Sequence, residues 1–107
     1  MKDKLLYICH PYTGDIEVNI LKVNTICNQL LNQGYWIYSP LTMSHPLEQL
    51  RHRDHSFWIK QDLKMLEKCD VLVLCEGWQD SKGCCMEYER ALRLPMEIVN
   101  VRDLLHD

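Results

Sequence analysis

The chain has 107 residues, with 12 Lys and Arg against 15 Asp and Glu, which gives a formal net charge of −3. This length predicts a single domain over residues 1–107, and the composition is that of an ordinary globular protein. The acidic balance provides no basic field to hold DNA or RNA. No apolar run approaches the ~18 residues of a membrane span, and no signal-peptide cleavage site follows the first apolar run. We therefore expect a cytoplasmic protein with neither a nucleic-acid nor a membrane partner.

The beginning of the chain predicts a strand followed by a helix. Residues 4–9 form a short apolar run, which is typical of a buried strand. Apolar residues then recur in steps of three and four over residues 16–31, the spacing of an amphipathic helix. Asp15 is the expected N-cap of this helix, and Gly34 is expected to end it.

The middle of the chain predicts a strand, a long loop, a helix and another strand. Residues 35–38 are aromatic and β-branched, as in a strand. We expect residues 39–53 to form a loop, and loops of that length in compact domains are usually functional or mobile. A helix is expected over residues 55–68 and a strand over residues 70–75.

The last part predicts a loop, a helix and a fourth strand. The loop covers residues 76–83, the helix continues to about Arg93 before Pro95, and the strand covers residues 96–101. Strands that alternate with helices build right-handed βαβ units and a parallel sheet. The sequence therefore predicts a three-layer α/β fold, Rossmann-like or flavodoxin-like, with about four parallel strands flanked by helices.

The six cysteines invite a disulfide or zinc interpretation. No C-x-x-C pair is present, and the adjacent pair Cys84-Cys85 suits neither a zinc site nor an easy disulfide. Cys9 and Cys75 lie within apolar, strand-like runs, where a free cysteine behaves as a small buried hydrophobe. We therefore expect reduced thiols.

Parallel sheets bind ligands at the carboxyl ends of their strands, where the loops 9–15, 39–46 and 76–83 should meet. The third loop places Ser81 and Gly83 directly before the N-terminus of a helix. Exposed backbone N–H groups and the helix dipole suit a phosphate or carboxylate there. Because glycines are also common turn formers, this signal is weak by itself.

One carboxylate lies on the inward side of the helix that follows this loop. The apolar stripe of that helix is Cys84, Tyr88 and Ala91, and Glu87 lies on the same stripe, near the N-terminus. An inward carboxylate at the active edge of a sheet suits a nucleophile or a base. The alternative is a capping or ion-paired glutamate.

A second carboxylate and a tyrosine occupy comparable positions. Asp62 lies four residues after Trp58 on one helix face, and a carboxyl group packed against Trp should resist ionisation, as a general acid requires. The alternative is an aspartate that reaches water past the Trp ring. Tyr7 lies near the carboxyl end of the first strand, where it is either a core residue or directs its hydroxyl into the site.

The histidines suggest a metal site only superficially. His45, His52 and His55, with Asp54, match no ligand spacing, so we expect no metal and a solvated helix start. His10 and His45 both fall in loops at the active edge of the sheet. These two are candidates for substrate contact.

The motifs together resemble the nucleoside 2-deoxyribosyltransferase-like superfamily, which includes the deoxynucleoside 5′-monophosphate N-glycosidases. The resemblance begins with LLYICHPYTGD, continues through GYWIYSPLTMSHP, and is strongest in FWIKQDLKMLEKCDVLVLCEGWQDSKGCCMEYERA. It combines D-L-x-M-L-x-x-C-D, G-W-x-x-S-x-G and a Glu four residues after that glycine. Each piece alone is common, whereas the combination is specific.

The resemblance implies cleavage of the N-glycosidic bond of a nucleoside or nucleotide without a cofactor. It implies that Glu87 attacks the anomeric carbon and that Asp62 assists departure of the base or positions the sugar. It further implies that Tyr7 orients the nucleophile and that Ser81 binds a 5′-phosphate. With water as acceptor the protein is a hydrolase, and with a second nucleobase it is a transferase.

The first loop departs from the pattern of the N-glycosidases, which carry a glycine-serine phosphate turn where this chain has Cys9-His10-Pro11. A phosphate there would have to contact His10, Thr13 or Gly14. Members of the superfamily form dimers or larger assemblies, so the resemblance also implies a homo-oligomer. The aromatic surfaces we expect it to bury are those of Trp36, Phe57 or Trp58.

Two hypotheses of different classes follow. The first is an enzyme, an N-glycosidase or deoxyribosyltransferase-like protein with Glu87 as nucleophile. The second is a non-catalytic module that binds a nucleotide at the same edge of the sheet. The altered first loop favours the module, whereas Tyr7, Asp62, Ser81 and Glu87 favour the enzyme.

Overall fold

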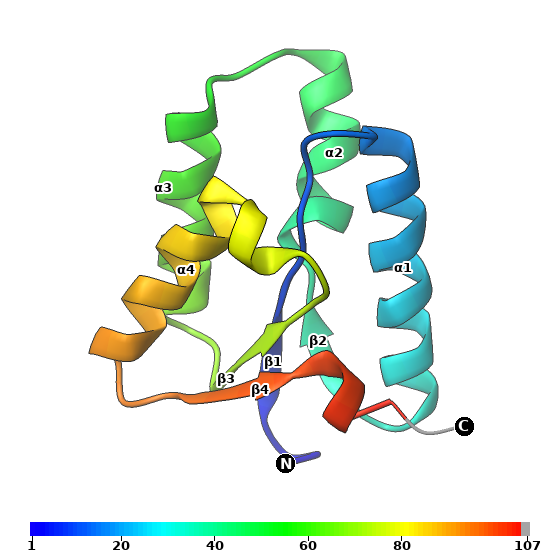
Figure 1. Ribbon diagram of the computed structural model, residues 1–107, viewed down its shortest axis with the longest axis vertical. Coiled ribbons are helices and arrows are strands. Elements are labelled where there is room, and N and C mark those ends of the chain that lie inside the picture. The colour runs from blue at the N-terminus through cyan, green and yellow to red at the C-terminus, as the bar shows by residue number, and fades with distance from the viewer. Residues whose placement is uncertain (106–107) are drawn as a thin grey trace.

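Four short strands form one parallel sheet in the order β2-β1-β3-β4. The computed structural model describes residues 1–105 (Figure 1). The strands are β1 (Leu5–Cys9), β2 (Trp36–Tyr38), β3 (Val71–Leu74) and β4 (Glu97–Asn100). The predicted α/β fold with a four-stranded parallel sheet is thus confirmed.

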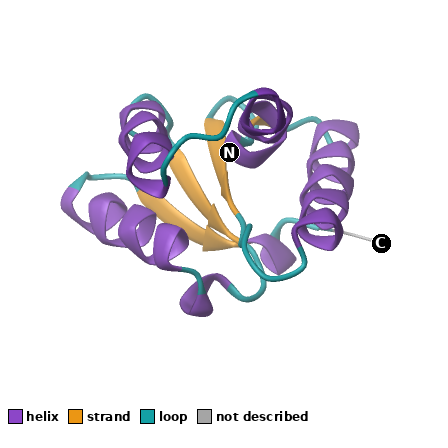
Figure 2. Cartoon of the chain, turned by 90° about the horizontal axis from the view of Figure 1, so that it is seen from above, coloured by secondary structure: helices purple, strands orange, loops and turns teal. Residues whose placement is uncertain are grey.

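Helices cover both faces of this sheet, as the view from above in Figure 2 shows. They are α1 (Ile16–Asn32), α2 (Pro40–Leu50), α3 (His55–Leu66) and α4 (Lys82–Arg93), with the short 3-10 turns η1 (Trp78–Asp80) and η2 (Val101–Asp103). Within residues 1–105, no helix combines the length and the apolar character that crossing a bilayer requires.

Side chains of successive strand residues point to opposite faces of the sheet, so the core has two parts. On one face, residues from β1 and β3 pack with α1 and η2; the buried members are Leu6, Ile8, Val23, Cys27, Leu30, Tyr35, Val71, Val73, Cys75, Val101 and Leu104. On the other face the strands pack with α3 and α4; the buried members are Tyr7, Cys9, Leu66, Cys69, Leu72, Leu74, Cys84 and Ala91. Tyr7 and Cys9 therefore face the same two helices that carry Asp62 and Glu87. All six cysteines are free thiols, as predicted.

The ends of the helices follow local sequence signals. The carboxylate of Asp15 accepts a hydrogen bond from the backbone N–H of Val18 at 3.2 Å, which confirms it as the N-cap of α1. Gly34 adopts a φ of 95°, the left-handed conformation that ends a helix at low steric cost. Ser81 caps α4 by accepting from the backbone N–H of Cys84 at 3.2 Å.

The prediction of a loop over residues 39–53 is wrong, because most of this segment is helix α2. Ser39 caps the helix and Pro40 occupies its first turn, where a missing N–H costs nothing. Pro46 lies inside the helix, where proline removes one intrahelical hydrogen bond and argues against helix in a sequence. Burial of Pro40 and Ser44, four residues apart, gives α2 an inward face despite this proline.

Candidate functional site

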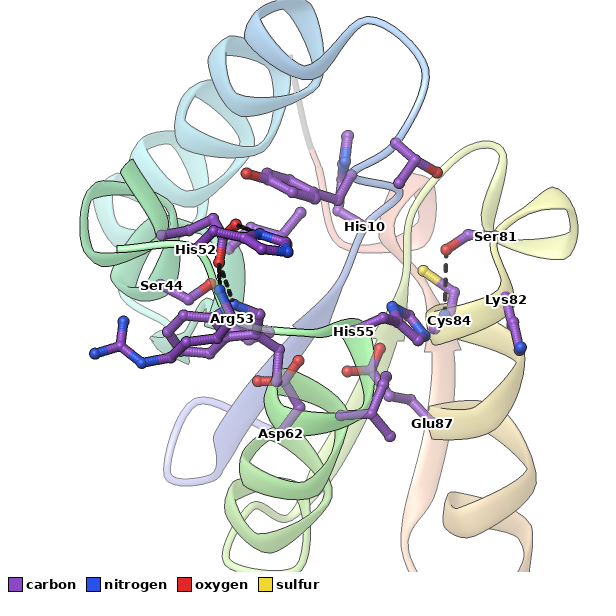
Figure 3. A pocket seen from close by; sticks show the side chains of 18 residues that line it. His10, Ser44, His52, Arg53, His55, Asp62, Ser81, Lys82, Cys84 and Glu87 are labelled. Carbon is purple, nitrogen blue, oxygen red and sulfur yellow. Dashed lines mark hydrogen bonds and ion pairs between the residues drawn. The ribbon is translucent and has the colours of Figure 1, made fainter. Parts of the chain in front are cut away.

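A pocket of about 510 Å³ lies beyond the carboxyl end of β1, bounded by α2, α3 and the N-terminal half of α4 (Figure 3). Each of these elements contributes polar side chains to its wall. These are His10, Tyr12 and Thr13 from the loop after β1, Ser44 and Glu48 from α2, Asp62 from α3, and Ser81, Lys82 and Glu87 from the start of α4. The pocket is thus at the edge of the sheet where the sequence predicted a ligand.

Glu87 enters the pocket from α4 and is held from behind by Tyr7. Its side chain is only 5% exposed, and its carboxylate accepts a hydrogen bond from the hydroxyl of Tyr7, which is fully buried on β1. Burial raises the pKa of Glu87 to about 7 and the negative charge of Asp62 also favours protonation, while the hydrogen bond from Tyr7 opposes the rise. Tyr7 therefore favours the ionised form of a carboxyl group that burial would otherwise keep neutral.

Asp62 enters the same pocket from α3 without such a partner. It is 8% exposed, and its Oδ1 is the one buried side-chain nitrogen or oxygen atom among residues 1–105 that lacks a hydrogen-bond partner. Burial raises the pKa of Asp62 to about 7. Figure 3 shows Asp62 and Glu87 among the side chains that line the pocket, and the charge of Asp62 acts on Glu87. An unpartnered carboxyl group with a raised pKa can donate a proton to a ligand near neutral pH.

The N-terminus of α4 forms a second part of the wall. Ser81, Lys82 and Gly83 all line the pocket there, so backbone N–H groups, a hydroxyl and an ammonium group are available to an anion. A Cβ atom at Gly83 would lie 3.3 Å from Cδ1 of Ile59 and 3.5 Å from Cε1 of His55. The glycine thus lets α4 approach α3 closely. This close approach brings Glu87 of α4 and Asp62 of α3 into the same pocket.

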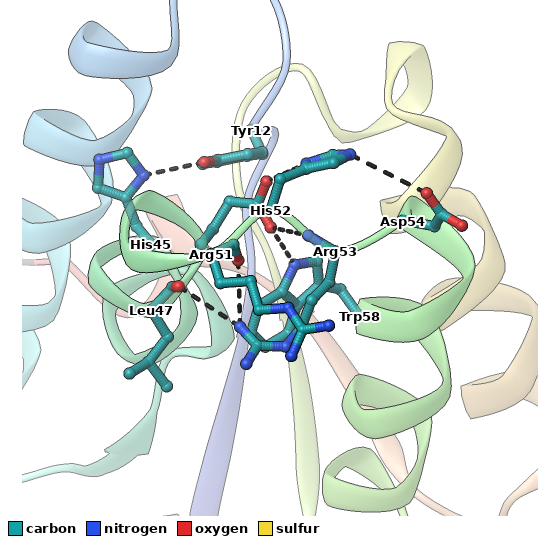
Figure 4. Close-up of polar contacts among 9 residues, drawn as sticks. Tyr12, His45, Leu47, Arg51, His52, Arg53, Asp54 and Trp58 are labelled. Carbon is teal, nitrogen blue, oxygen red and sulfur yellow. Dashed lines mark hydrogen bonds and ion pairs between the residues drawn. The ribbon is translucent and has the colours of Figure 1, made fainter.

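The opposite wall depends on Glu48, which joins α2 to the start of α3. Its Oε1 accepts hydrogen bonds from Nε1 of Trp58 at 2.8 Å and from the backbone N–H of Arg53 at 2.9 Å, and its Oε2 pairs with His52. These hydrogen bonds lower the pKa of Glu48 to about 2, and the one from Trp58 has the largest effect. The guanidinium of Arg53 also lies over the ring of Phe57 and over that of Trp58, which Figure 4 shows.

The structure brings most of the predicted site residues together. The pocket is lined by Glu87, Asp62, Ser81, Gly83, His10 and Thr13. Tyr7 lies behind Glu87, while Gly14 and His45 do not line the pocket. His45 contacts it indirectly, through a 2.9 Å hydrogen bond between its Nδ1 and the hydroxyl of Tyr12 (Figure 4). Gly14 adopts a φ of 100° in the turn before α1.

Several pocket residues were not predicted from the sequence. Ser44, Glu48 and Arg53 all fall in the segment that we expected to be a loop, and Arg53 is its last residue. Ser44 and Glu48 are four residues apart, a helical spacing that could have indicated a shared face. Pro46 between them concealed that signal.

One set of metal-ligating side chains converges in the described part of the chain. Ligand atoms of Cys9, Cys84 and Glu87 all lie within 4.8 Å of one another, and all three residues are buried. The sequence predicted no metal site, neither at the histidines nor at the cysteines. The thiol cluster lies behind the nucleophile candidate.

Comparison with known proteins places the chain in a family. Residues 4–101 match the family described as a domain of unknown function, DUF7768. The chain belongs to this family. Among curated proteins, none matches the sequence.

A solved structure with the same fold as this DUF7768 domain is a 2-deoxyribosyltransferase from the psychrotolerant bacterium Bacillus psychrosaccharolyticus. The TM-score is 0.59 at 17% sequence identity, and the match covers 95% of this chain and 82% of the other. At this identity the likeness shows a shared fold. It supports the resemblance predicted from the sequence as a distant relationship in fold.

Proposed function

We propose that this protein cleaves the N-glycosidic bond of a nucleoside or nucleoside 5′-monophosphate, with Glu87 as nucleophile and Asp62 as general acid. The observation that carries the proposal is the pairing of two buried carboxyl groups in one pocket with different partners. Glu87 accepts a hydrogen bond from Tyr7, which favours the carboxylate. Asp62 has an unpartnered Oδ1 and a pKa raised by burial alone, which favours the acid. A shared fold with a 2-deoxyribosyltransferase supports the same chemistry.

In the first step, a carboxylate oxygen of Glu87 forms a bond to the anomeric carbon of the sugar. The bond from that carbon to the base nitrogen breaks, and its electron pair leaves with the base. Asp62 delivers its proton to the departing base. The product is a sugar ester of Glu87, and the negative charge moves from Glu87 to Asp62.

In the second step, water or a second base attacks the anomeric carbon, and the ester bond to Glu87 breaks. The ionised Asp62 takes the proton of the attacking group. Both carboxyl groups thus return to their starting states, and the anomeric configuration is retained after two inversions. Tyr7 stabilises the carboxylate of Glu87 before attack and again after its release.

The N-terminus of α4 is the proposed contact for the 5′ side of the sugar. Ser81, Lys82 and the backbone of Gly83 offer hydrogen-bond donors and positive charge next to Glu87. A phosphate held there would place the anomeric carbon deeper in the pocket, toward the carboxylates. His10 and Thr13, on the loop after β1, line the pocket as further candidate contacts.

Release of free base from a panel of ribo- and deoxyribonucleosides and their 5′-monophosphates, followed by chromatography, tests the proposal. We expect release by the wild type and a loss of more than about 1,000-fold with Glu87→Gln, because the nucleophile contributes only through the reaction itself. Asp62→Asn should lose about 100- to 10,000-fold, the usual contribution of a general acid. Acid-quenched wild type should carry one sugar on the peptide that contains Glu87.

Glu89→Gln is the matched control, because Glu89 lies on the same helix but is exposed, away from the pocket. Its rate should equal that of the wild type. An unchanged rate in Glu87→Gln would contradict the assignment of the nucleophile. Absence of base release from every compound, with clear thermal stabilisation by one of them, would replace the enzyme by the non-catalytic nucleotide-binding module.

A further inference from the structure

Two thiol groups lie directly behind the proposed nucleophile. Cys9 is the last residue of β1, and Cys84 lies in the first turn of α4, one turn before Glu87. The thiol of Cys9 is 3.9 Å from the backbone carbonyl of Cys84. The two sulfur atoms and a carboxylate oxygen of Glu87 all lie within 4.8 Å of one another. The mechanism proposed above uses neither thiol.

This group has the composition of a zinc-type site. Two thiolates and one carboxylate are suitable protein ligands for Zn²⁺ or Cd²⁺, and a water molecule can complete a tetrahedral shell. With metal–sulfur bonds of about 2.3 Å, ligand atoms in such a shell lie about 3.5–3.8 Å apart. Side-chain adjustments of about 1 Å would bring these three atoms from their present separations to that geometry.

The position of these three side chains allows an ion to reach them from solvent, and their charge can hold it. Cys84 and Glu87 line the pocket, so an ion can approach them from solvent, while Cys9 is fully buried behind them. Tyr7 contacts Glu87 and the carboxyl group of Asp62 lines the same pocket, whereas Lys82 and the N-terminus of α4 supply positive charge on the outer side of Glu87. The negative charge that would hold a divalent cation there is that of the ligands themselves, two thiolates and one carboxylate once they are deprotonated.

We propose that Cys9, Cys84 and Glu87 form a binding site for a thiophilic divalent cation of the zinc class, and that the bound ion blocks the nucleophile. Binding displaces the thiol protons of Cys9 and Cys84, and that of Glu87 where it is protonated; no electron is transferred. The carboxylate then coordinates the ion and is withheld from the anomeric carbon. The blocking rests on the proposed function, whereas the binding does not.

Cd²⁺ is the probe for binding, because thiolate-to-cadmium charge-transfer absorption in the ultraviolet reports sulfur ligands and ignores histidines such as His52 and His55. The titration uses the full chain with Cys85→Ser, since the thiol of Cys85 is the one that is not fully buried. A phosphine reductant keeps the thiols reduced. We expect one equivalent of Cd²⁺ and an absorption that corresponds to two thiolates.

Cys9→Ser and Cys84→Ser, each added to that background, should weaken Cd²⁺ binding by more than about 100-fold, because even residues outside the coordination shell contribute about 10- to 100-fold. Glu87→Gln should weaken it while the absorption of two thiolates persists at saturation. Cys69→Ser, which removes a buried thiol elsewhere, should leave the titration unchanged. Equal affinity and absorption in Cys84→Ser and its parent, or no thiolate absorption in the parent, would overturn the site.

Cys9→Ala provides a second test if the serine at this core position prevents folding, which circular dichroism would show. It should lose Cd²⁺ binding in the same way while it retains the helical spectrum. A folded Cys9→Ala variant that binds Cd²⁺ like its parent would overturn the role of Cys9.

The blocking is tested with Zn²⁺ in the base-release assay, each variant compared with its own metal-free rate. We expect Zn²⁺ to suppress release in the parent, a chelator to restore it, and Cys9→Ser to require more than about 100-fold more Zn²⁺ for the same suppression. Full release at saturating Zn²⁺ would overturn the blocking. If the metal-free protein released no base but bound Cd²⁺ through two thiolates, the proposed function would fail and the binding site would stand.

Discussion

Glu87 and Asp62 are buried to a similar extent, but within the described part of the chain only Glu87 has a hydrogen-bond partner. This difference determines their proposed roles. Burial raises the pKa of both groups to about 7, so the two carboxyl groups together carry roughly one negative charge near neutral pH. The hydroxyl of Tyr7 donates to Glu87, whereas Oδ1 of Asp62 has no partner. The shared charge therefore resides preferentially on Glu87, and the shared proton on Asp62.

Tyr7→Phe tests whether the hydroxyl of Tyr7 keeps the negative charge on Glu87. Loss of a hydrogen bond to a charged group is worth about 1.5–3 kcal/mol, so we expect base release to fall about 10- to 100-fold. Because the hydroxyl lowers the pKa of Glu87, its removal should raise that pKa. The acid side of the pH–rate profile, measured with chelator present, should therefore move to higher pH.

Tyr35→Phe is the control for Tyr7→Phe, because Tyr35 is also buried but packs on the opposite face of the sheet. It should leave both the rate and the pH profile unchanged. A Tyr7→Phe enzyme that lost activity without any movement of the acid side would mean that Tyr7 acts through packing instead of through the ionisation of Glu87.

At the scale of the elements, the junction between α2 and α3 shapes the wall opposite α4. Glu48, near the end of α2, holds the backbone of Arg53 and the indole of Trp58 at the start of α3. Both Arg53 and Trp58 line the pocket. The carboxylate of Glu48 thus fixes the relative position of two helices that both line the pocket.

Glu48→Gln should loosen this junction. The pKa of Glu48 is lowered to about 2 in the folded protein, so its contribution to stability is present above the ordinary glutamate pKa and is lost as the pH falls through about 2. The variant should therefore melt at a lower temperature than the wild type at pH 7, and the difference should shrink toward pH 2–3. The KM for base release should rise, because Trp58 and Arg53 lose their fixed positions.

Glu67→Gln is the matched comparison for Glu48→Gln, since Glu67 pairs with Arg90 at 2.9 Å on an exposed part of the surface. Exposed pairs contribute little to stability, so this variant should melt close to the wild type at both pH values. Equal losses in the two variants at pH 7 would contradict the role assigned to Glu48.

The same junction shows where prediction from sequence reaches its limit. Periodicity over residues 16–31 predicted α1 together with its cap Asp15, because local spacing determines both features. In α2, Pro46 interrupts the local signal, and tertiary burial of Pro40 and Ser44 decides the conformation instead. A helix that depends on its neighbours to this extent cannot be recognised from its own residues.

At the scale of the whole molecule, alternation of strands and helices was sufficient to predict the parallel sheet, because βαβ connections have one hand. The stripes of α3 and α4 likewise placed Asp62 and Glu87 on inward faces. The hydrogen bond between Tyr7 and Glu87 joins residues 80 apart in the chain, and the missing partner of Asp62 is a property of the assembled pocket. Neither is a feature of local spacing, so only the fold could provide them.

The buried carboxyl group of Asp62 should lower the free energy of unfolding of the protein near and above neutral pH. Asp62 has a pKa of about 7 in the folded protein against an ordinary value of 3.8, so the folded state binds its proton more tightly than the unfolded state does. Stability is then highest below about pH 4 as far as Asp62 is concerned, and it decreases as the pH rises to about 7. Above that pH, a buried charge without a partner remains.

Asp62→Asn should remove this pH-dependent cost, because the amide does not ionise. At about 1.4 kcal/mol per pKa unit, the variant should gain up to about 4 kcal/mol in free energy of unfolding at pH 8 relative to the wild type, and much less at pH 4. Urea denaturation at the two pH values measures the difference, with Asp80→Asn as an exposed control. A gain of equal size at both pH values would mean that it does not come from the ionisation of Asp62, and a loss at pH 8 would mean that a partner stabilises the ionised form. A gain confined to pH 8, together with loss of base release, would indicate that the pocket retains a destabilising carboxyl group because the reaction requires it.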